Sequence, residues 1–448
     1  MQNKKILFAT MPFDGHFNPL TGLAVYLQSM GYEVAWYAGP SYTEKLRKLR
    51  VAHYPYQKAL EISHLNLEEL FPERKRIKGA IARIRFDLNH VFINRIPEFV
   101  EDVKRIHQEW PFDMIVYDFA FTAGPVLKQL LNIPVAAVGV VPYSETSNDL
   151  PPAGMGLSPS FNFLGKKWHT FLTYVTTKVL LKPCTDLFNQ FMIQYSLEPT
   201  KDFVFDAAVR LPDLYLQSGV PGFEYKRKNR SKNVRFVGPL LPYKGNVKHY
   251  FTQAARTKEY QKVLLVTQGT VERDINKIIV PTLEAYKNNL DMLVIVTTGG
   301  FQTAELRARY PQTNFIIEDF IDFNSVMPFV HVYVTNAGYG GVMLSIQHNV
   351  PMVTAGIHEG KNEIAARVGY FKVGIDLKTE TPKPAQIRRS VEEILSNKQY
   401  RRNVQKLSSE FRQYASNELS EKYIRELLQK AENSATLHQF QEVNYQSV

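Results

Sequence analysis

The apolar positions of the first half of the chain follow one rhythm. Short apolar runs alternate with longer helical stretches, and polar or Gly/Pro turns separate them. Near-continuous apolar runs between helices are typical of parallel strands that are buried on both faces. A helix is predicted over Leu20–Met30, after a loop through residues 12–19, and Gly31 would end it. The predicted strands are Ile6–Thr10, Glu33–Tyr37, Met114–Tyr117, Val135–Val138 and Asp213–Gln217.

The same rhythm starts again at Lys262. Helices are expected at Ile278–Asn288 and Asn362–Val368, and a charged helix near Tyr400–Ala431. Two such halves predict an α/β protein made of two doubly wound, Rossmann-like domains that face a central cleft. The predicted strands of the second half are Val263–Thr267, Leu293–Thr297, Phe315–Ile317, Val332–Thr335, Met352–Thr354 and Val373–Ile375. The expected division is a first domain over residues 1–240, a linker over 241–260, a second domain over 261–415, and a closing helix and tail over 416–448 that packs back on the first domain.

Composition narrows the class of protein. The chain has 448 residues, of which 44% are hydrophobic and 22% charged, and this excludes a disordered or fibrous chain. Cys184 is the single cysteine, so no internal disulfide framework or cysteine-based metal knuckle is possible, and a reducing compartment is indicated. No run reaches the ~20 apolar residues of a membrane span, and the first apolar run is too short for a signal peptide. We expect a cytoplasmic protein.

The charge balance points to anionic partners. Lys and Arg number 54 against 43 Asp and Glu, a formal charge of +11. No recognisable nucleic-acid module accompanies it, so nucleic acid is not an expected partner. The basic runs Arg74–Arg85 and Lys226–Arg230 are interpreted mainly as solvated surface. The first run interleaves Ile77, Ile81 and Ile84 as an amphipathic helix would, which leaves open a weak peripheral contact with acidic lipid headgroups.

Two stretches of the first half depart from the rhythm. Ser144–Pro159 is rich in Pro, Gly and Ser and predicts a long functional loop. Phe161–Tyr195 carries many aromatic residues, which either line an apolar substrate pocket or pack helices together.

Candidate chemistry lies in the loops that follow the strands, because ligands of open α/β sheets bind at the carboxyl ends of the strands. In Val334–Val342 a strand runs into a glycine-rich turn and then a helix. Glycines there let backbone N–H groups approach a phosphate, with the positive end of the helix dipole behind them. Gln268-Gly269-Thr270 would hold the other side of a diphosphate, and Gly299-Gly300 is a weaker version of the same turn. The chain has neither a Walker A motif nor G-x-G-x-x-G, so nicotinamide dinucleotides are not indicated.

A second candidate group stands in the first domain. His16 follows the first strand, within Asp14-Gly15-His16-Phe17-Asn18-Pro19, and is a candidate general base. Asp118 directly follows the strand Met114–Tyr117. A carboxylate bonded to one imidazole nitrogen fixes the tautomer and stabilises the charged ring once a proton is taken. A lone histidine is more often structural, so the hypothesis here is that the fold brings His16 and Asp118 into contact.

These motifs also carry a family resemblance. Along the chain, the segments that carry the resemblance are Gly15–Pro19, Gln268–Thr270, Asp319-Phe320-Ile321, Thr335–Val342, Asn349–Val353 and Ala365–Val368. In this order they resemble the family 1 glycosyltransferases of the GT-B fold, most of all bacterial members that act on small natural products, near the macrolide and flavonoid glycosyltransferases. The resemblance covers both domains. It is strongest across residues 315–377 and weaker between 40 and 260, where such enzymes hold their acceptors.

The resemblance implies inverting transfer of a sugar from a nucleoside diphosphate sugar to a hydroxyl of a hydrophobic small molecule. His16 would take the acceptor proton and Asp118 would orient it. Phe320 would stack on the base, and Ile321 would pair with it through its backbone. No metal or separate cofactor is implied; a UDP-sugar or dTDP-sugar is the co-substrate, most commonly UDP-glucose. The remaining implied donor residues are Gly15, Gly269, Thr270, Asn336, Gly338, Gly340, Gly341, Glu359, Lys361 and Asn362.

Departures from the family pattern leave parts of the donor site open. Asn336 stands where a phosphate-binding His is common, and Gly340-Gly341 replaces Asn-Ser. Leu344 falls where a Glu often holds the ribose hydroxyls. Lys361-Asn362, with His358-Glu359 upstream, replaces the pair that reads the sugar. The base, the sugar and the oligomeric state therefore stay undetermined. A membrane-associated glycolipid synthase, an inactive auxiliary protein and a nucleotide-sugar epimerase remain as alternatives.

Overall fold

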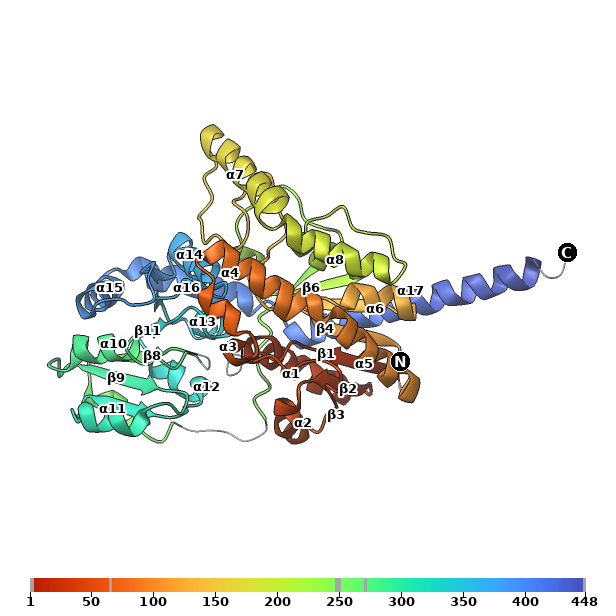
Figure 1. The fold of residues 1–448 in the computed structure, drawn as a ribbon. Coiled ribbons are helices and arrows are strands. Elements are labelled where there is room, and N and C mark those ends of the chain that lie inside the picture. Colours follow the sequence, from red (N-terminus) through yellow and green to blue (C-terminus); the bar gives the residue numbers. More distant parts are fainter. Residues whose placement is uncertain (1–3, 64–66, 246–250, 270–271, 446–448) are drawn as a thin grey trace.

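The computed structural model describes residues 4–63, 67–245, 251–269 and 272–445 (Figure 1). Each half of the chain forms a parallel sheet. The first sheet has seven strands in the order β3-β2-β1-β4-β5-β6-β7, and the second has six in the order β10-β9-β8-β11-β12-β13. In both sheets the order reverses at the first strand of the half, as in doubly wound folds. The prediction of two Rossmann-like domains is confirmed.

The strands are β1 (Lys5–Ala9), β2 (Glu33–Ala38), β3 (Ala52–Pro55), β4 (Met114–Asp118), β5 (Val135–Gly139), β6 (Leu214–Ser218), β7 (Val234–Gly238), β8 (Lys262–Thr267), β9 (Met292–Thr297), β10 (Phe315–Glu318), β11 (Val332–Thr335), β12 (Met352–Thr354) and β13 (Gly374–Asp376). Sequence patterning missed β3 and β7. Both are edge strands with only one neighbour, and their side chains are partly exposed, so neither has the continuous apolar run of a central strand.

The α-helices are α1 (Asp14–Ser29), α2 (Thr43–Leu49), α3 (Leu67–Leu70), α4 (Ala80–Asp87), α5 (Ile96–Glu109), α6 (Gly124–Leu131), α7 (Phe163–Val175), α8 (Lys182–Gln194), α9 (Val204–Arg210), α10 (Ile279–Tyr286), α11 (Thr303–Arg309), α12 (Phe323–Val326), α13 (Tyr339–Gln347), α14 (Lys361–Tyr370), α15 (Pro384–Ser396), α16 (Lys398–Phe411) and α17 (Ser416–Tyr445). Short 3₁₀ or π segments are η1 (Pro40–Tyr42), η2 (Pro72–Arg76), η3 (Leu88–Phe92), η4 (Ile93–Arg95), η5 (Thr176–Leu180), η6 (Pro221–Phe223), η7 (Ala254–Glu259) and η8 (Met327–Phe329). Within the described part of the chain, no helix is long and apolar enough to cross a membrane.

Three helix predictions were wrong. Helix α1 begins at Asp14, so residues 14–19, which were expected to form a loop, are the first turns of this helix. The Phe13 carbonyl accepts hydrogen bonds from the N–H groups of His16 and Phe17 and so starts the helix. The charged C-terminal helix is two helices, α16 and α17. The basic run from Arg74 is split between η2 and α4, with Gly79 at φ +91° between them, so it is not one amphipathic helix.

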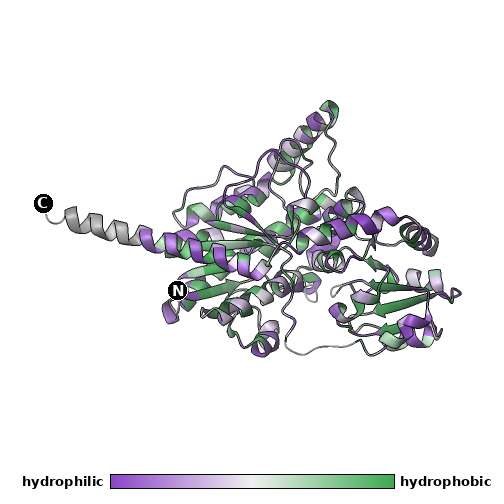
Figure 2. Cartoon of the chain, turned by 180° about the vertical axis from the view of Figure 1, so that it is seen from behind, coloured by the Kyte–Doolittle hydropathy of each residue, from purple (hydrophilic) through white to green (hydrophobic). Residues whose placement is uncertain are grey.

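Helices cover both faces of each sheet, and the apolar residues lie mainly along the strands (Figures 1 and 2). Ile424 and Leu428 of α17 are buried in the core of the first domain, beside α1 and the strands β6 and β7. Phe411 of α16 belongs to the core of the second domain, which also takes in Phe223 of η6. The two domains are therefore held together by the end of the chain as well as by direct contacts.

The carboxyl ends of the two sheets meet. Tyr339 opens α13 after β11 in the second domain, and its hydroxyl donates to the carbonyl of Ser218 at the end of β6 (2.8 Å). Helix α1 also packs against α13. The loops that follow the strands of both domains are thus brought to one place, which is where open α/β sheets bind ligands.

Candidate active site

His16 and Asp118 form a direct pair at the end of the first sheet. His16 lies in the first turn of α1, after β1, and Asp118 is the last residue of the adjacent strand β4. The distance from His16 Nδ1 to Asp118 Oδ1 is 2.6 Å. The Asp118 carboxylate is fully buried and also accepts from the N–H groups of Met11 (2.7 Å) and Ala120 (3.0 Å). Asp118 is therefore fixed in position and orients the imidazole.

The other ring nitrogen of His16, Nε2, makes no hydrogen bond to the described residues. The side chain is part-exposed, and its ring lies between Phe13 (centroids 5.7 Å apart) and Phe119 (6.1 Å, stacked). Phe119 also lines a small apolar cavity of about 20 Å³, together with Tyr117, Phe121, Thr122, Pro125, Phe188, Val204 and Ala208. The arrangement suits a base that faces an apolar small molecule. Gly15 precedes His16, and a Cβ there would meet no atom within 4 Å.

The glycine turn between β11 and α13 presents its backbone to open space. Ala337 has φ +65°, a left-handed conformation, and turns the chain into the helix, with Gly338 as the N-cap. A Cβ at Gly340 would meet no atom within 4 Å, one at Gly338 only Asn336 Oδ1 at 3.8 Å, and one at Gly341 the Tyr333 hydroxyl at 3.1 Å. The start of α13 therefore offers uncrowded N–H groups to an anion.

The turn after β8 lies against the turn after β11. The buried Asn336 side-chain amide donates to the carbonyl of Gln268, and a Cβ on Gly269 would come within 3.3 Å of the same amide nitrogen. Gly269 has φ +76°, which favours glycine. Thr270 lies outside the described residues. Asn336 thus ties the two predicted phosphate turns together.

Phe320 and Ile321 follow β10. Phe320 is 73% exposed, which is unusual for a Phe, and its ring faces the glycine turn after β9: a Cβ on Gly300 would lie 3.5 Å from the ring. Ile321 is half-buried and packs on the core of the second domain. An exposed ring beside a flat, side-chain-free turn is a platform on which a planar base can stack.

The residues predicted to read the sugar are engaged with one another and with the first domain. Lys361 Nζ pairs with Glu359 Oε2 (2.7 Å). Glu359 (φ +57°) and Gly360 (φ +75°) form the turn into α14. Asn362 Nδ2 donates to the carbonyl of Gly154 (2.8 Å), in the long loop before α7. Asn362 therefore faces this loop rather than standing free.

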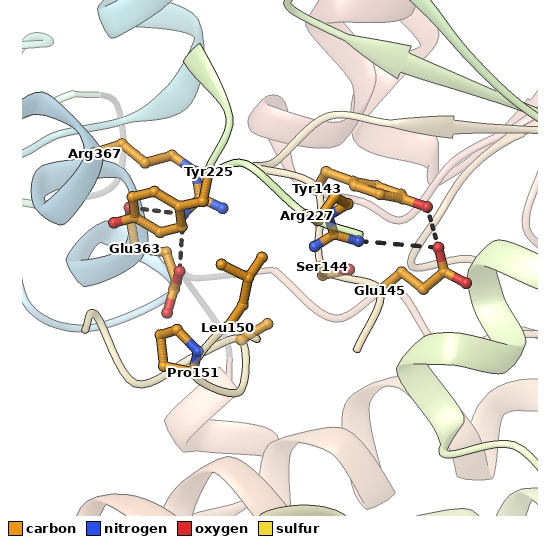
Figure 3. A pocket seen from close by; sticks show the side chains of 10 residues that line it. Tyr143, Ser144, Glu145, Leu150, Pro151, Tyr225, Arg227, Glu363 and Arg367 are labelled. Carbon is orange, nitrogen blue, oxygen red and sulfur yellow. Dashed lines mark hydrogen bonds and ion pairs between the residues drawn. The ribbon is translucent and has the colours of Figure 1, made fainter. Parts of the chain in front are cut away.

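A largely buried ionic network that sequence analysis did not anticipate joins the same loop to α14. Glu363 Oε1 accepts from the N–H groups of Gly154 (2.9 Å) and Gly156 (2.7 Å). Figure 3 shows Glu363 paired with Arg367 beside Leu150 and Pro151 of this loop. Arg367, only 4% exposed, donates to Glu363 Oε2 (2.9 Å) and to Glu224 Oε2 of the first domain (3.0 Å). Arg367 lay in a motif quoted for the family resemblance, but no sequence signal reveals a partner 143 residues away.

Glu145 anchors the start of this loop. Its carboxylate pairs with Arg210 Nε (2.8 Å) and accepts from the Ser231 N–H (3.1 Å) and from the Tyr143 hydroxyl. Burial alone would raise the pKa of Glu145, but the hydrogen bonds from Ser231, Tyr143 and Arg210 outweigh it and hold the pKa below its usual range. Arg227 stacks on the Tyr143 ring (4.2 Å), and burial lowers its pKa.

No group of three or more His, Cys, Asp or Glu side chains gathers as a metal site would require, anywhere in the described ranges.

Comparison with known proteins shows which protein family this chain resembles. The UDP-glucoronosyl and UDP-glucosyl transferase family matches residues 306–417. The 4'-demethylrebeccamycin synthase of Lentzea aerocolonigenes is 32% identical over 410 residues, covering 91% of this chain and 95% of that protein. UDP-glycosyltransferase 2 of Phaeomoniella chlamydospora is 26% identical, covering 91% and 92%. The crystal structure of the glycotransferase of kitacinnamycin superposes with a TM-score of 0.74 at 18% identity, over 96% of this chain and all of that one.

Proposed function

The chain belongs to the UDP-glucoronosyl and UDP-glucosyl transferase family, the family 1 glycosyltransferases of GT-B fold. We propose that it is an inverting, metal-independent enzyme. It would move a sugar from a nucleoside diphosphate sugar to a hydroxyl of a hydrophobic small molecule. The observation that carries the proposal is the His16–Asp118 pair, whose imidazole lies between the rings of Phe13 and Phe119 with Nε2 not bonded to the described residues.

In the proposed reaction His16 Nε2 accepts the proton of the acceptor hydroxyl. Asp118 accepts a hydrogen bond from the Nδ1–H of His16 and stabilises the imidazolium that forms. Two backbone N–H groups fix the Asp118 carboxylate in position. The acceptor oxygen attacks the anomeric carbon from the face opposite the diphosphate. The new carbon–oxygen bond forms as the bond from the anomeric carbon to the phosphate oxygen breaks, so the configuration inverts and the nucleoside diphosphate leaves.

The leaving diphosphate gains negative charge as that bond breaks. We assign its stabilisation to the N–H groups of the turn around Gly338 and Gly340 and to the positive end of the α13 dipole. Asn336 cannot carry charge, and its amide is bonded to the Gln268 carbonyl, so the backbone takes the larger share. We propose metal independence because these backbone N–H groups and the α13 N-terminus supply the positive charge that a metal ion would otherwise bring.

For the donor we propose a UDP-sugar, most readily UDP-glucose, with a dTDP-sugar as the second choice. The matched family supports uridine, and the exposed Phe320 suits stacking with either base. Leu344 cannot bond the ribose hydroxyls, so the ribose contact must come from elsewhere. For the acceptor we propose a natural product of aromatic or macrocyclic type. This rests on the aromatic rings of Phe13 and Phe119 that flank His16 and on the similarity to 4'-demethylrebeccamycin synthase.

A thermal-shift panel of nucleoside diphosphates and their sugars, with and without EDTA, tests the donor half. A ligand at a hundredfold excess over its Kd adds ~2.7 kcal/mol to the free energy of unfolding. We expect a shift with UDP or UDP-glucose that EDTA leaves unchanged. A shift that EDTA abolishes would overturn metal independence, and no shift with any nucleotide would favour an inactive auxiliary protein. NMR of a glycosylated product then gives the anomeric configuration, and retention would overturn the inverting mechanism.

A further inference from the structure

Helix α7 has its apolar face turned outward. Five large side chains lie 54–75% exposed on it: Phe163, Leu164, Trp168, Phe171 and Tyr174. The side chains that α7 and the following η5 bury are polar instead, namely His169, Thr176 and Thr177. A helix of a globular protein normally buries its apolar stripe and exposes its polar face, so this helix is reversed. Figure 1 shows that α7 projects away from the body of the molecule.

The outward face of α7 is neither substrate pocket nor helix packing, the two interpretations that the sequence allowed for these aromatics. The aromatic residue of this stretch that lines the apolar cavity is Phe188 of α8, which is buried. Trp168 and Phe171 stack on each other in the open, with ring centroids 5.5 Å apart. A contiguous apolar patch on the surface marks an interaction site.

The charge around this patch selects the partner. Between Asp149 and Asp186 the chain carries Lys166, Lys167, Lys178 and Lys182 and no acidic residue. Lys167 Nζ lies 4.5 Å from the centre of the Phe163 ring, so cation and aromatic face are interleaved. A second copy placed face to face would set lysines against lysines, whereas an anionic surface is complementary to them.

The neighbouring helix α4 extends the basic and apolar character. The carbonyl of Arg85 on α4 lies 4.0 Å from Cys184 Sγ at the start of α8, so α4 reaches the helix that follows α7 and η5. Ile81 and Ile84 of α4 are exposed as well. Aromatic residues with flanking lysines are the composition of helices that lie in the headgroup region of anionic membranes.

We propose that α7 is a docking surface for an anionic lipid bilayer, with its aromatic side chains among the headgroups and its lysines on lipid phosphates. The interaction is peripheral and reversible, and it does not depend on the proposed catalytic function.

Vesicle co-sedimentation tests the surface. We expect wild-type protein to bind phosphatidylcholine–phosphatidylglycerol vesicles at low salt, to bind less at high salt, and not to bind pure phosphatidylcholine. The double variant Trp168→Ser/Phe171→Ser should bind on the order of tenfold more weakly or worse, because it removes two apolar anchors. Leu290→Ser is the control, since Leu290 is an exposed apolar residue (73%) that lies on the second domain, and it should bind like wild type.

Tryptophan fluorescence locates the contact. The chain has three Trp residues. Trp36 is fully buried and Trp110 is partly buried against the core of the first domain, so a blue shift on adding anionic vesicles should come mainly from the exposed Trp168. Trp168→Phe keeps the apolar anchor and should retain binding while losing the shift. Absence of vesicle binding at low salt, or equal loss in Leu290→Ser, would overturn the proposal. So would a dimer in light scattering that Trp168→Ser/Phe171→Ser dissociates, because a second copy would then cover the face.

Discussion

His16 is the residue on which the proposed chemistry depends. A positioned general base contributes ~10²–10⁴-fold to the rate. We predict that His16→Ala lowers turnover by this factor and leaves the donor Kd unchanged, because no donor contact is assigned to the imidazole. Initial rates and calorimetric titration with UDP measure the two quantities. His53→Ala, a half-buried histidine of the edge strand β3, is the control and should keep wild-type turnover. Wild-type turnover in His16→Ala would refute the base assignment.

The sequence predicted the His16–Asp118 contact because His16 follows β1 in the first turn of α1 and Asp118 ends the adjacent parallel strand β4, so both lie at the carboxyl edge of the same sheet. It did not predict the partner of Asn362. That amide reaches the Gly154 carbonyl, 208 residues earlier, across a domain contact that no local pattern encodes. Site residues that depend on one domain can therefore be read from sequence, and those that depend on the docking of two cannot.

At the scale of elements, the central strands were predictable, and of the edge strands β10 and β13 were predicted while β3 and β7 were missed. A central strand such as β8 is buried on both faces and reads as an unbroken apolar run. The edge strand β7 carries the exposed Arg235, which interrupts the run. For helix α7 the prediction failed in the opposite direction. Its aromatic residues predicted a buried helix or a pocket lining, but in the structure they are exposed.

The turn into α13 allows donor binding to be separated from folding. Gly338 has φ −60° and ψ 134°, which any residue can adopt, and a Cβ there touches only Asn336 Oδ1 at 3.8 Å. We predict that Gly338→Val keeps the wild-type melting temperature but weakens donor binding about tenfold or more, which is about 1.4 kcal/mol, because the added methyl groups block the N–H groups. Calorimetric titration with UDP measures the loss.

Gly356→Ala is the informative contrast to Gly338→Val. A Cβ at Gly356 would lie 2.2 Å from the backbone oxygen of Asn336, so the turn itself must move and the melting temperature should fall. Unchanged UDP affinity in Gly338→Val, with the fold intact, would mean that the diphosphate binds elsewhere.

For the whole molecule, the buried Glu145 links stability to pH. Its pKa is below the ordinary 4.5 in the folded state, so its contribution is complete above pH 4.5 and is lost as the pH falls through the folded pKa. We predict that Glu145→Gln lowers the free energy of unfolding by about 3 kcal/mol at neutral pH, since Arg210 loses a buried partner. The difference from wild type should shrink in acid. Urea titrations across this range measure it.

The matched control for Glu145→Gln is Glu426→Gln, which removes an exposed carboxylate 4.0 Å from Lys422 and should change stability by less than about 1 kcal/mol at any pH. A difference between Glu145→Gln and wild type that stays constant from neutral pH into acid would show that the Glu145 charge does not contribute.

The last prediction concerns the coupling of the two domains. Arg367 of α14 lies between Glu363, which holds the Gly154–Gly156 backbone, and Glu224 of the first domain. Burial alone would lower the pKa of Arg367, but the two carboxylates raise it above its usual value, so the guanidinium stays charged. Because the bridge spans the domains, Arg367→Met should lower the melting temperature and also weaken acceptor binding, by releasing the loop that leads to α7.

A double-mutant cycle separates this bridge from simple packing. Arg367→Met leaves Glu224 buried without its partner, and Glu224→Gln leaves Arg367 with one carboxylate, so each single change costs free energy of unfolding. If the ion pair couples the domains, the double variant should lose about 1–3 kcal/mol less than the sum of the two single losses. Additive losses would mean that the Arg367–Glu224 ion pair does not couple the domains, which would then be held by the packing of α16 and α17 and by other contacts such as Tyr339–Ser218.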